Sequence, residues 1–118
     1  MTAKHQVLIV GGGTAGLTVA SQLLERDDAP EVAVIEPSDT HYYQPLWTLI
    51  WAGVLPKEES ARPMADVMPT GATWIQDRAT ELDPENNAVT TANGDTYEYD
   101  YLVMAAGIQI NWDGIPGL

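Results

Sequence analysis

Three glycines that follow a short apolar run constrain this chain more than any other feature. The run Val7–Val10 leads into Gly11, Gly13 and Gly16, which fit the pattern G-x-G-x-x-G. Gly11 allows the chain to turn sharply off a strand, where a side chain would clash. Gly13 lets the backbone come close to a pyrophosphate, and Gly16 lets the following helix lie close against the strand. We therefore expect a strand, a tight turn and a helix in this order.

The residues after the glycines complete a dinucleotide-binding fingerprint. Apolar residues at three- and four-residue spacing predict a helix over about 14–26, and the apolar run 32–35 predicts the next strand. Glu36 follows that strand, where an acid can accept hydrogen bonds from an adenosine ribose and repel a 2′-phosphate. The free amides of the first helical turn, at the positive end of the helix dipole, suit a pyrophosphate. The fingerprint does not separate FAD from NAD.

Composition excludes several other kinds of chemistry. The 118 residues predict one domain with a modest core, too small for an FAD enzyme with a second nucleotide-binding fold. The absence of cysteine excludes disulfides, thiolate metal sites and cysteine nucleophiles within this chain. His5 and His41 lie far apart without metal-ligand spacing, and His5 is expected at the surface of a polar lead-in over residues 1–6. We expect neither a catalytic residue nor a metal site here.

The charge balance is strongly acidic. Seventeen Asp and Glu residues face five Lys and Arg, which gives a formal net charge of −12. Such a field repels nucleic-acid phosphates and anionic lipids, so a nucleotide must be held by backbone amides rather than by a basic pocket. This surplus of acid resembles that of proteins from very salty cytoplasm, and an ordinary acidic surface is the alternative. Unfolding on dialysis to low salt would support the first interpretation, and indifference to salt would contradict it.

The sequence predicts a soluble, cytoplasmic chain. No apolar stretch approaches the roughly twenty residues that span a bilayer. The apolar run 7–10 is too short for a signal peptide and is broken by glycines, so it is interpreted as a strand.

An aromatic-rich segment, residues 41–53, follows the second predicted strand. From Pro45 it can form a helix, because proline is favoured in the first helical turn and Gly53 provides a stop. Its Tyr and Trp residues suit either a core helix or a cover over a flat, planar cofactor. Periodicity alone favours the core helix.

The second half of the chain is expected to form strands after a short helix near 64–68. A strong hairpin signal at 93–95 predicts a small antiparallel meander. The predicted strands cover residues 74–76, 79–82, 88–91, 96–99 and 101–105. After the last strand, Ala106 and Gly107 are small enough for a second approach of backbone to ligand. The predicted fold class is α/β, a Rossmann-like FAD/NAD(P)-binding fold with a parallel sheet and a small antiparallel β-meander.

Two longer stretches resemble known flavoproteins. Residues 99–107, YDYLVMAAG, are similar to the Tyr-Asp-x-Leu-Val-x-Ala-x-Gly strand of flavoproteins with two dinucleotide-binding domains, with Ala106 where threonine is common. Residues 41–49, HYYQPLWTL, followed by Ala52-Gly53, resemble the sulfide:quinone oxidoreductases, especially the mitochondrial-like type. The resemblance extends over 7–118.

The resemblance implies a peripheral membrane flavoenzyme that oxidises sulfide to sulfane sulfur and passes electrons through FAD to a quinone. It also assigns cofactor contacts to nine positions. These are Gly11, Gly13, Thr14, Ala15 and Gly16 for the pyrophosphate, Glu36 for the ribose, Gln44 for FAD, the Ala79 backbone for adenine, and Gly107 near the cofactor.

The chain departs from that family in three respects. The paired cysteines, the quinone site with its membrane-contacting segment, and the Gly-Asp strand that binds the flavin ribitol do not occur within residues 1–118. The resemblance therefore implies the N-terminal part of an FAD-binding domain, incomplete relative to the full flavoenzyme and unable to complete the sulfide reaction alone. Two alternatives stay open: a segment of a type II NADH:quinone oxidoreductase, and an inactive nucleotide-binding module.

Overall fold

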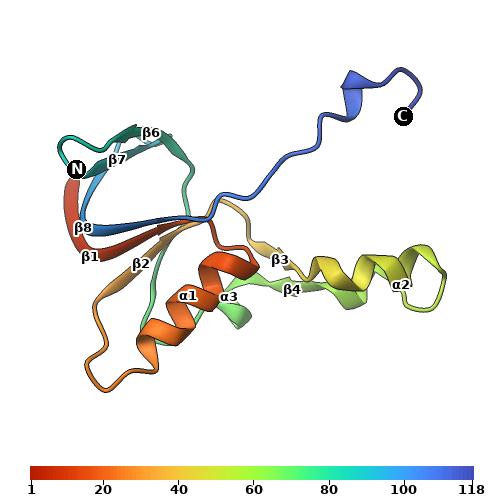
Figure 1. Cartoon of the computed structure of the whole chain (residues 1–118), viewed down its shortest axis with the longest axis horizontal. Helices are drawn as coiled ribbons and strands as arrows, with labels where there is room; N and C mark the ends of the chain where they lie inside the picture. The colour runs from red at the N-terminus through yellow and green to blue at the C-terminus, as the bar shows by residue number, and fades with distance from the viewer.

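A computed structural model describes the whole chain, residues 1–118, and places a six-stranded sheet of order β5-β2-β1-β8-β7-β6 at its centre (Figure 1). β1 (Thr2–Val10) pairs in parallel with both β2 (Val32–Ile35) and β8 (Thr96–Met104). β5 (Thr73–Ile75) adds a fourth parallel strand beside β2. The predicted α/β class with a parallel sheet is confirmed.

The remaining two strands, β6 (Ala79–Asp83) and β7 (Ala88–Thr91), form the predicted antiparallel meander with β8. Because β8 pairs with β1 along its whole length and with β7 at its start, the meander continues the same sheet and curls over one of its faces (Figure 1). The prediction of two separate strands at 96–99 and 101–105 was wrong, since Asp100 continues the strand and pairs with Lys4 at 2.8 Å.

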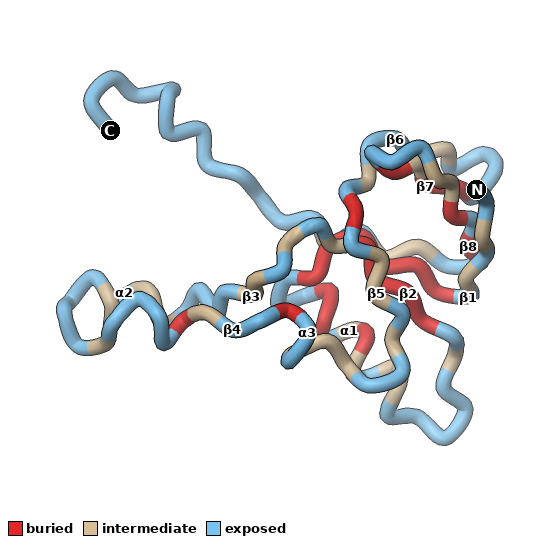
Figure 2. Tube along the Cα trace, turned by 180° about the vertical axis from the view of Figure 1, so that it is seen from behind, coloured by how far each residue is buried: buried red, intermediate tan, exposed pale blue.

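Alternation along β1 divides the core into two layers. Val7 and Ile9 face the helix α1 (Thr14–Leu24), whereas Leu8 and Val10 face the meander. All four are buried, as Figure 2 shows for the centre of the sheet. Burial of each such side chain contributes about 1.5–3 kcal/mol. The carboxyl end of β1 is therefore a rigid base from which the glycine turn starts.

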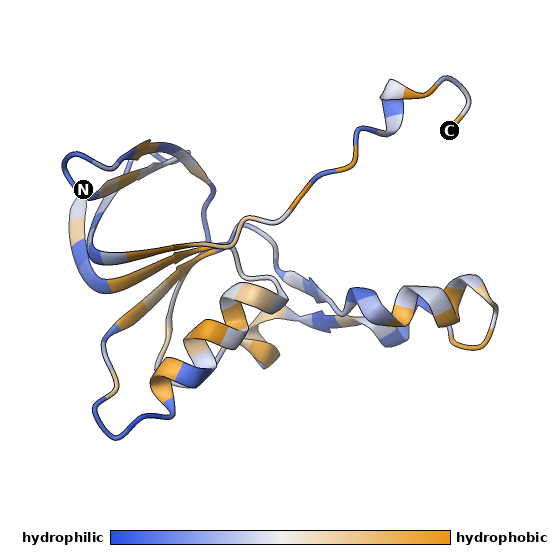
Figure 3. Ribbon diagram, in the orientation of Figure 1, coloured by the Kyte–Doolittle hydropathy of each residue, from blue (hydrophilic) through white to orange (hydrophobic).

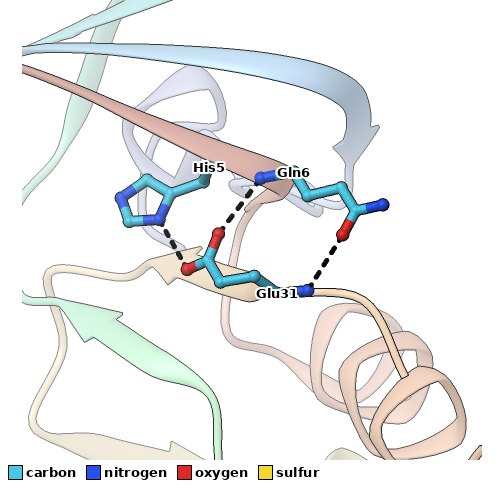
Figure 4. Close-up of polar contacts among 3 residues, drawn as sticks. All are labelled: His5, Gln6 and Glu31. Carbon is cyan, nitrogen blue, oxygen red and sulfur yellow. Dashed lines mark hydrogen bonds and ion pairs between the residues drawn. The ribbon is translucent and has the colours of Figure 1, made fainter. Parts of the chain in front are cut away.

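The polar lead-in predicted for residues 1–6 is instead the first half of β1, and His5 is not a free surface residue. Its ring stacks on Tyr97 with centroids 6.0 Å apart, and its Nδ1 lies 2.7 Å from a carboxylate oxygen of Glu31 (Figure 4). The other Glu31 oxygen accepts the Gln6 amide, and the Gln6 side chain accepts the Glu31 amide. Sequence pattern missed this cluster because it joins residues 25 and 26 positions apart.

The aromatic segment forms an arm that projects from the sheet (Figure 1). Its base is an antiparallel pair, β3 (Thr40–Tyr42) and β4 (Ala61–Pro63). Three short helical segments, η1 (Gln44–Leu46), α2 (Trp47–Trp51) and η2 (Lys57–Ser60), lie between these strands, and α3 (Met64–Val67) follows them.

The core-helix interpretation of the segment was wrong. No residue of η1 or α2 is buried, and Trp51 is 80% exposed. Apolar residues occur toward the far end of the arm, away from the sheet (Figure 3), and Leu49, Trp51 and Val54 there are exposed. By contrast, the short helix predicted near 64–68 is present, and Met64 is buried. Nowhere in the chain does a helix combine the length and the apolar character needed to traverse a bilayer.

Asp77 fixes the entry into the meander. One carboxylate oxygen accepts the Arg78 amide at 2.7 Å and the other accepts the Asn93 amide at 3.3 Å. Asp77 is buried, and hydrogen bonding from the Thr91 hydroxyl together with these two amides lowers the pKa of its carboxyl group below the ordinary value. The ionised form is therefore the one that the fold stabilises.

The lowered pKa of Asp77 predicts a defined pH dependence of stability. The contribution is fully present above the pKa of the unfolded chain and is lost as the pH falls through the lower pKa of the folded chain. We expect Asp77→Asn to be less stable than wild type at pH 7, with the difference shrinking below about pH 4. Urea denaturation at pH 7 and pH 3 measures both values. A difference that stays constant with pH would contradict this account.

Candidate functional site

Two glycines of the fingerprint shape the turn at the end of β1. Gly11 has φ +109°, and a Cβ there would overlap the carbonyl oxygen of Ala105. A Cβ on Gly16 would overlap the carbonyl oxygen of Gly11. The Gly11 amide donates to the Ile35 carbonyl at 2.9 Å, which fixes the turn to β2. The predicted roles of these glycines in turning the chain and seating the helix are confirmed.

The next part of the turn is open. Gly13 is exposed, has an ordinary φ of −77°, and has no atom within 4 Å of where its Cβ would lie. Gly13 is the N-cap residue of α1 and makes no side-chain hydrogen bond to the helix. The amides of the first turn have no partner inside the helix, because no helical carbonyl precedes them, and the cap side chain does not supply one either. Thr14 and Ala15 are exposed beside it. These amides, at the positive end of the helix dipole, can receive an anion.

An open cavity of about 580 Å³ lies in front of this turn. It brings together residues from the turn, the arm and the end of β8. They are Gly13, Thr14, Ala15, Gln44, Pro45, Ala105 and Gly107. Five of the nine predicted cofactor contacts therefore share one cavity, although they come from segments up to 94 residues apart (Gly13 and Gly107).

A second cavity of about 300 Å³ contains Gly11, Glu36 and Ala79, three more of the predicted contacts. The Glu36 amide donates to the Ile75 carbonyl at 3.0 Å, so the backbone of this acid is held at the end of β2. Its carboxylate makes no hydrogen bond or ion pair within the chain. Glu36 is half-buried and free to accept hydrogen bonds from a ligand. The ninth residue, Gly16, is buried and lines neither cavity.

The structure adds two residues that sequence reasoning missed. Arg78 lines the cavity beside Glu36 and Ala79, and its position next to Ala79 was the available signal. His41 places Nδ1 3.2 Å from the carbonyl oxygen of Gly12, across 29 residues. Because a carbonyl only accepts, Nδ1 must carry the hydrogen in this contact. No pattern in the sequence indicated it.

A parallel sheet, a glycine turn leading into a helix, and an acid at the end of the second strand define a dinucleotide-binding fold of the Rossmann type. The family described as pyridine nucleotide-disulphide oxidoreductase matches residues 5–118, and the chain belongs to this family. FAD is the cofactor of the family, as the resemblance implied.

Individual relatives agree with the resemblance seen in the sequence. The chain is 44% identical over 114 residues to the mitochondrial sulfide:quinone oxidoreductase of Dictyostelium discoideum, which is 96% of this chain and 25% of that protein. The structure of the sulfide:quinone oxidoreductase from Aquifex aeolicus matches with a TM-score of 0.80 and 31% identity, over 93% of this chain and 26% of that one. A type II NADH:quinone oxidoreductase of Staphylococcus haemolyticus is 30% identical over 119 residues, 98% of this chain and 29% of that protein.

The chain thus spans about a quarter of the length of these relatives. Its residues fit the adenosine and diphosphate part of FAD, because the open turn at Gly13 has room for a ligand and the Glu36 carboxylate has no other partner.

The different surroundings of the glycines predict different effects on stability. We expect Gly16→Ala to lower the free energy of unfolding by about 1–3 kcal/mol, since its methyl group must displace α1 from the turn. Gly13→Ala should lower it by no more than about 1 kcal/mol, the effect of a poorer N-cap residue. Urea denaturation of both variants is the measurement. Equal losses would show that the turn is not packed as described.

Proposed function

We propose that residues 1–118 are the N-terminal part of the FAD-binding domain of an oxidoreductase that oxidises sulfide to sulfane sulfur and reduces a quinone. The observation that carries the proposal is the open glycine turn, whose cap makes no side-chain hydrogen bond, with an unpartnered acid beside it. The 44% identity to a sulfide:quinone oxidoreductase over nearly the whole chain supports the choice of reaction.

Backbone donors hold the diphosphate in this proposal. The exposed residues Gly13, Thr14 and Ala15 line the larger cavity, and amides of the first helical turn supply partial positive charge where the side chains supply none. This matters in a chain of net charge −12, where a trianionic or dianionic ligand meets a repulsive field. Amides that point at the ligand act at hydrogen-bond distance, where they outweigh more distant and screened carboxylates.

The adenosine lies on the other side of the turn. The Glu36 carboxylate accepts hydrogen bonds from the ribose hydroxyls, and the backbone of Ala79 meets the adenine. Arg78 lines the same cavity and places a cation beside Glu36. The sum of these contacts selects an adenosine without a 2′-phosphate, because Glu36 would repel that group.

The flavin end of FAD is oriented by the arm and by the end of β8. Gln44 and Gly107 lie in one cavity with Gly13, and they offer a side-chain amide and an open backbone. When bound, FAD supplies the two-electron redox chemistry that links sulfide to quinone. This chain binds and orients it, and the sulfur itself is handled by residues outside the 118, since none of these is cysteine. Contact with the membrane and the quinone belongs to those other segments as well.

A type II NADH:quinone oxidoreductase is the second candidate, because the Staphylococcus haemolyticus protein of that name is 30% identical over nearly the whole chain. An inactive nucleotide-binding module is the third. Neither is favoured by the aromatic stretch at 41–49, which is the segment that resembles the sulfide enzymes.

Binding of ADP tests the nucleotide site directly on the 118-residue chain. We expect saturable binding by calorimetry, weakened roughly tenfold or more by Glu36→Gln, since hydrogen bonds to a charged group contribute about 1.5–3 kcal/mol. Gly13→Ala should weaken ADP by at least a similar factor, because its methyl group occupies the approach to the diphosphate. The absence of ADP binding to wild type would favour the inactive module.

The reaction is tested on the whole enzyme that contains this chain. Sulfide added under anaerobic conditions is expected to bleach the flavin absorbance, and a quinone should restore it. NADH is the matched control reductant. Bleaching by NADH and not by sulfide would overturn the proposed reaction and establish the second candidate.

A further inference from the structure

We propose that Gly12, the residue between the first two fingerprint glycines, is a positioning residue that gives the site its specificity for the ribose hydroxyl. This inference rests on the proposed function. The fingerprint pattern leaves this position free, so the sequence gives no reason for a third consecutive glycine. The reason lies in what a side chain here would meet.

The space beside Gly12 is filled by Glu36. A Cβ on Gly12 would lie 2.8 Å from both Cβ and Cγ of Glu36 and 3.5 Å from its Cδ. These are the three nearest atoms, and the first two distances are shorter than real side chains tolerate. Gly12 is buried, and its φ is outside the left-handed region, so alanine would not be strained by the backbone itself. The conflict is confined to one neighbouring side chain.

The turn cannot move aside to relieve this conflict. The Gly12 carbonyl accepts a hydrogen bond from His41 Nδ1 at 3.2 Å, which ties it to the base of the arm. The preceding amide, that of Gly11, donates to the Ile35 carbonyl at 2.9 Å. The peptide group that follows the Gly12 Cα is therefore held by the arm, and the residue that precedes Gly12 is held by β2.

The backbone of Glu36 is held equally firmly. Its amide donates to the Ile75 carbonyl at 3.0 Å, and its carbonyl accepts the Trp74 indole N–H at 2.9 Å. Only the side chain beyond Cβ is free, because the carboxylate has no partner in the chain. A methyl group on Gly12 must therefore push Cγ away, and the carboxylate turns with it. The conflict with the Glu36 Cβ, also at 2.8 Å, is not relieved by this rotation, so the substitution costs stability as well.

The displaced group is the Glu36 carboxylate, which in the proposed site accepts a hydrogen bond from the ribose. A site that hydrogen-bonds a ligand hydroxyl discriminates against the analogue that lacks it. Glu36 lines the cavity proposed for the adenosine, whereas the exposed residues Gly13 to Ala15 line the other cavity. A side chain at Gly12 therefore acts on the ribose contact, whereas one at Gly13 acts on the diphosphate contact.

The test compares ADP with 2′-deoxy-ADP by calorimetry on the 118-residue chain. Wild type should prefer ADP by roughly tenfold or more, the effect of one hydrogen bond to a carboxylate. In Gly12→Ala the preference should fall to within about twofold, with 2′-deoxy-ADP bound within about threefold of wild type. Gly13→Ala is the matched control, because it should weaken both ligands alike and keep their ratio.

A double-mutant cycle that measures the melting temperature provides an independent test if Gly12→Ala folds poorly. Glu36→Gly removes both atoms that conflict with the new methyl group. Gly12→Ala should therefore lower the melting temperature in wild type but not in the Glu36→Gly background, a non-additivity expected only of groups in contact.

The outcomes separate this inference from the proposed function. A Gly12→Ala variant that keeps the ADP preference, or equal loss of melting temperature in both backgrounds, overturns the role of Gly12 while ADP binding stands. A wild-type chain that binds neither nucleotide overturns the proposed function and this inference with it. Loss of the preference in Gly12→Ala, with the ratio retained in Gly13→Ala, supports the inference.

Discussion

The contact between the glycine turn and the end of β8 is the constraint on which the rest of the structure depends. Gly11 lies so close to the Ala105 carbonyl that no side chain fits between them, and Gly16 lies as close to the Gly11 carbonyl. The two contacts join the first strand, the first helix and the last strand at one point. Because these backbones are in contact, the amides of α1 and the small residues after β8 face the same opening. The site is a consequence of backbone packing.

The acidic net charge of the chain makes the site depend more strongly on backbone donors. A chain with net charge −12 has few cations to offer an anionic ligand, and several of those it has are engaged elsewhere. Lys4 pairs with Asp100, Arg26 pairs with Asp28, and Arg62 donates to backbone carbonyls. In the proposed site, the helix terminus supplies the attraction and an acid, Glu36, supplies the selection.

The parts of the fold that follow local rules could be predicted from the sequence. The turn at Gly11, the first helix, the hairpin at 93–95 and the parallel strands each have a signal within a few residues. The polar start of β1 and the continuation of β8 through Asp100 could not, because a strand's partner decides whether polar residues join it. The prediction of a core helix in the arm was wrong for a related reason. Periodicity shows that a helix has an apolar face, but not whether the sheet covers that face.

The residues of the candidate site also divide into those with a local signal in the sequence and those without one. The fingerprint glycines and Glu36 were predicted from spacing, and Gly107 from its small size after the last strand. Gln44 and Ala79 needed a resemblance, because only the fold brings them near the turn. Resemblance also led to the family, which the match over residues 5–118 now shows. The contact between His41 and Gly12 had no signal of either kind, since it depends on the path of the arm.

The account is tested most directly by following the backbone amides of the ¹⁵N-labelled chain by NMR while ADP is added. It predicts saturable shifts of the Gly13, Thr14 and Ala15 resonances, with a single dissociation constant, while the resonances of α2 stay unchanged. Saturable shifts confined to other parts of the chain, or none at all, would contradict the claim that bare amides at the glycine turn receive a diphosphate.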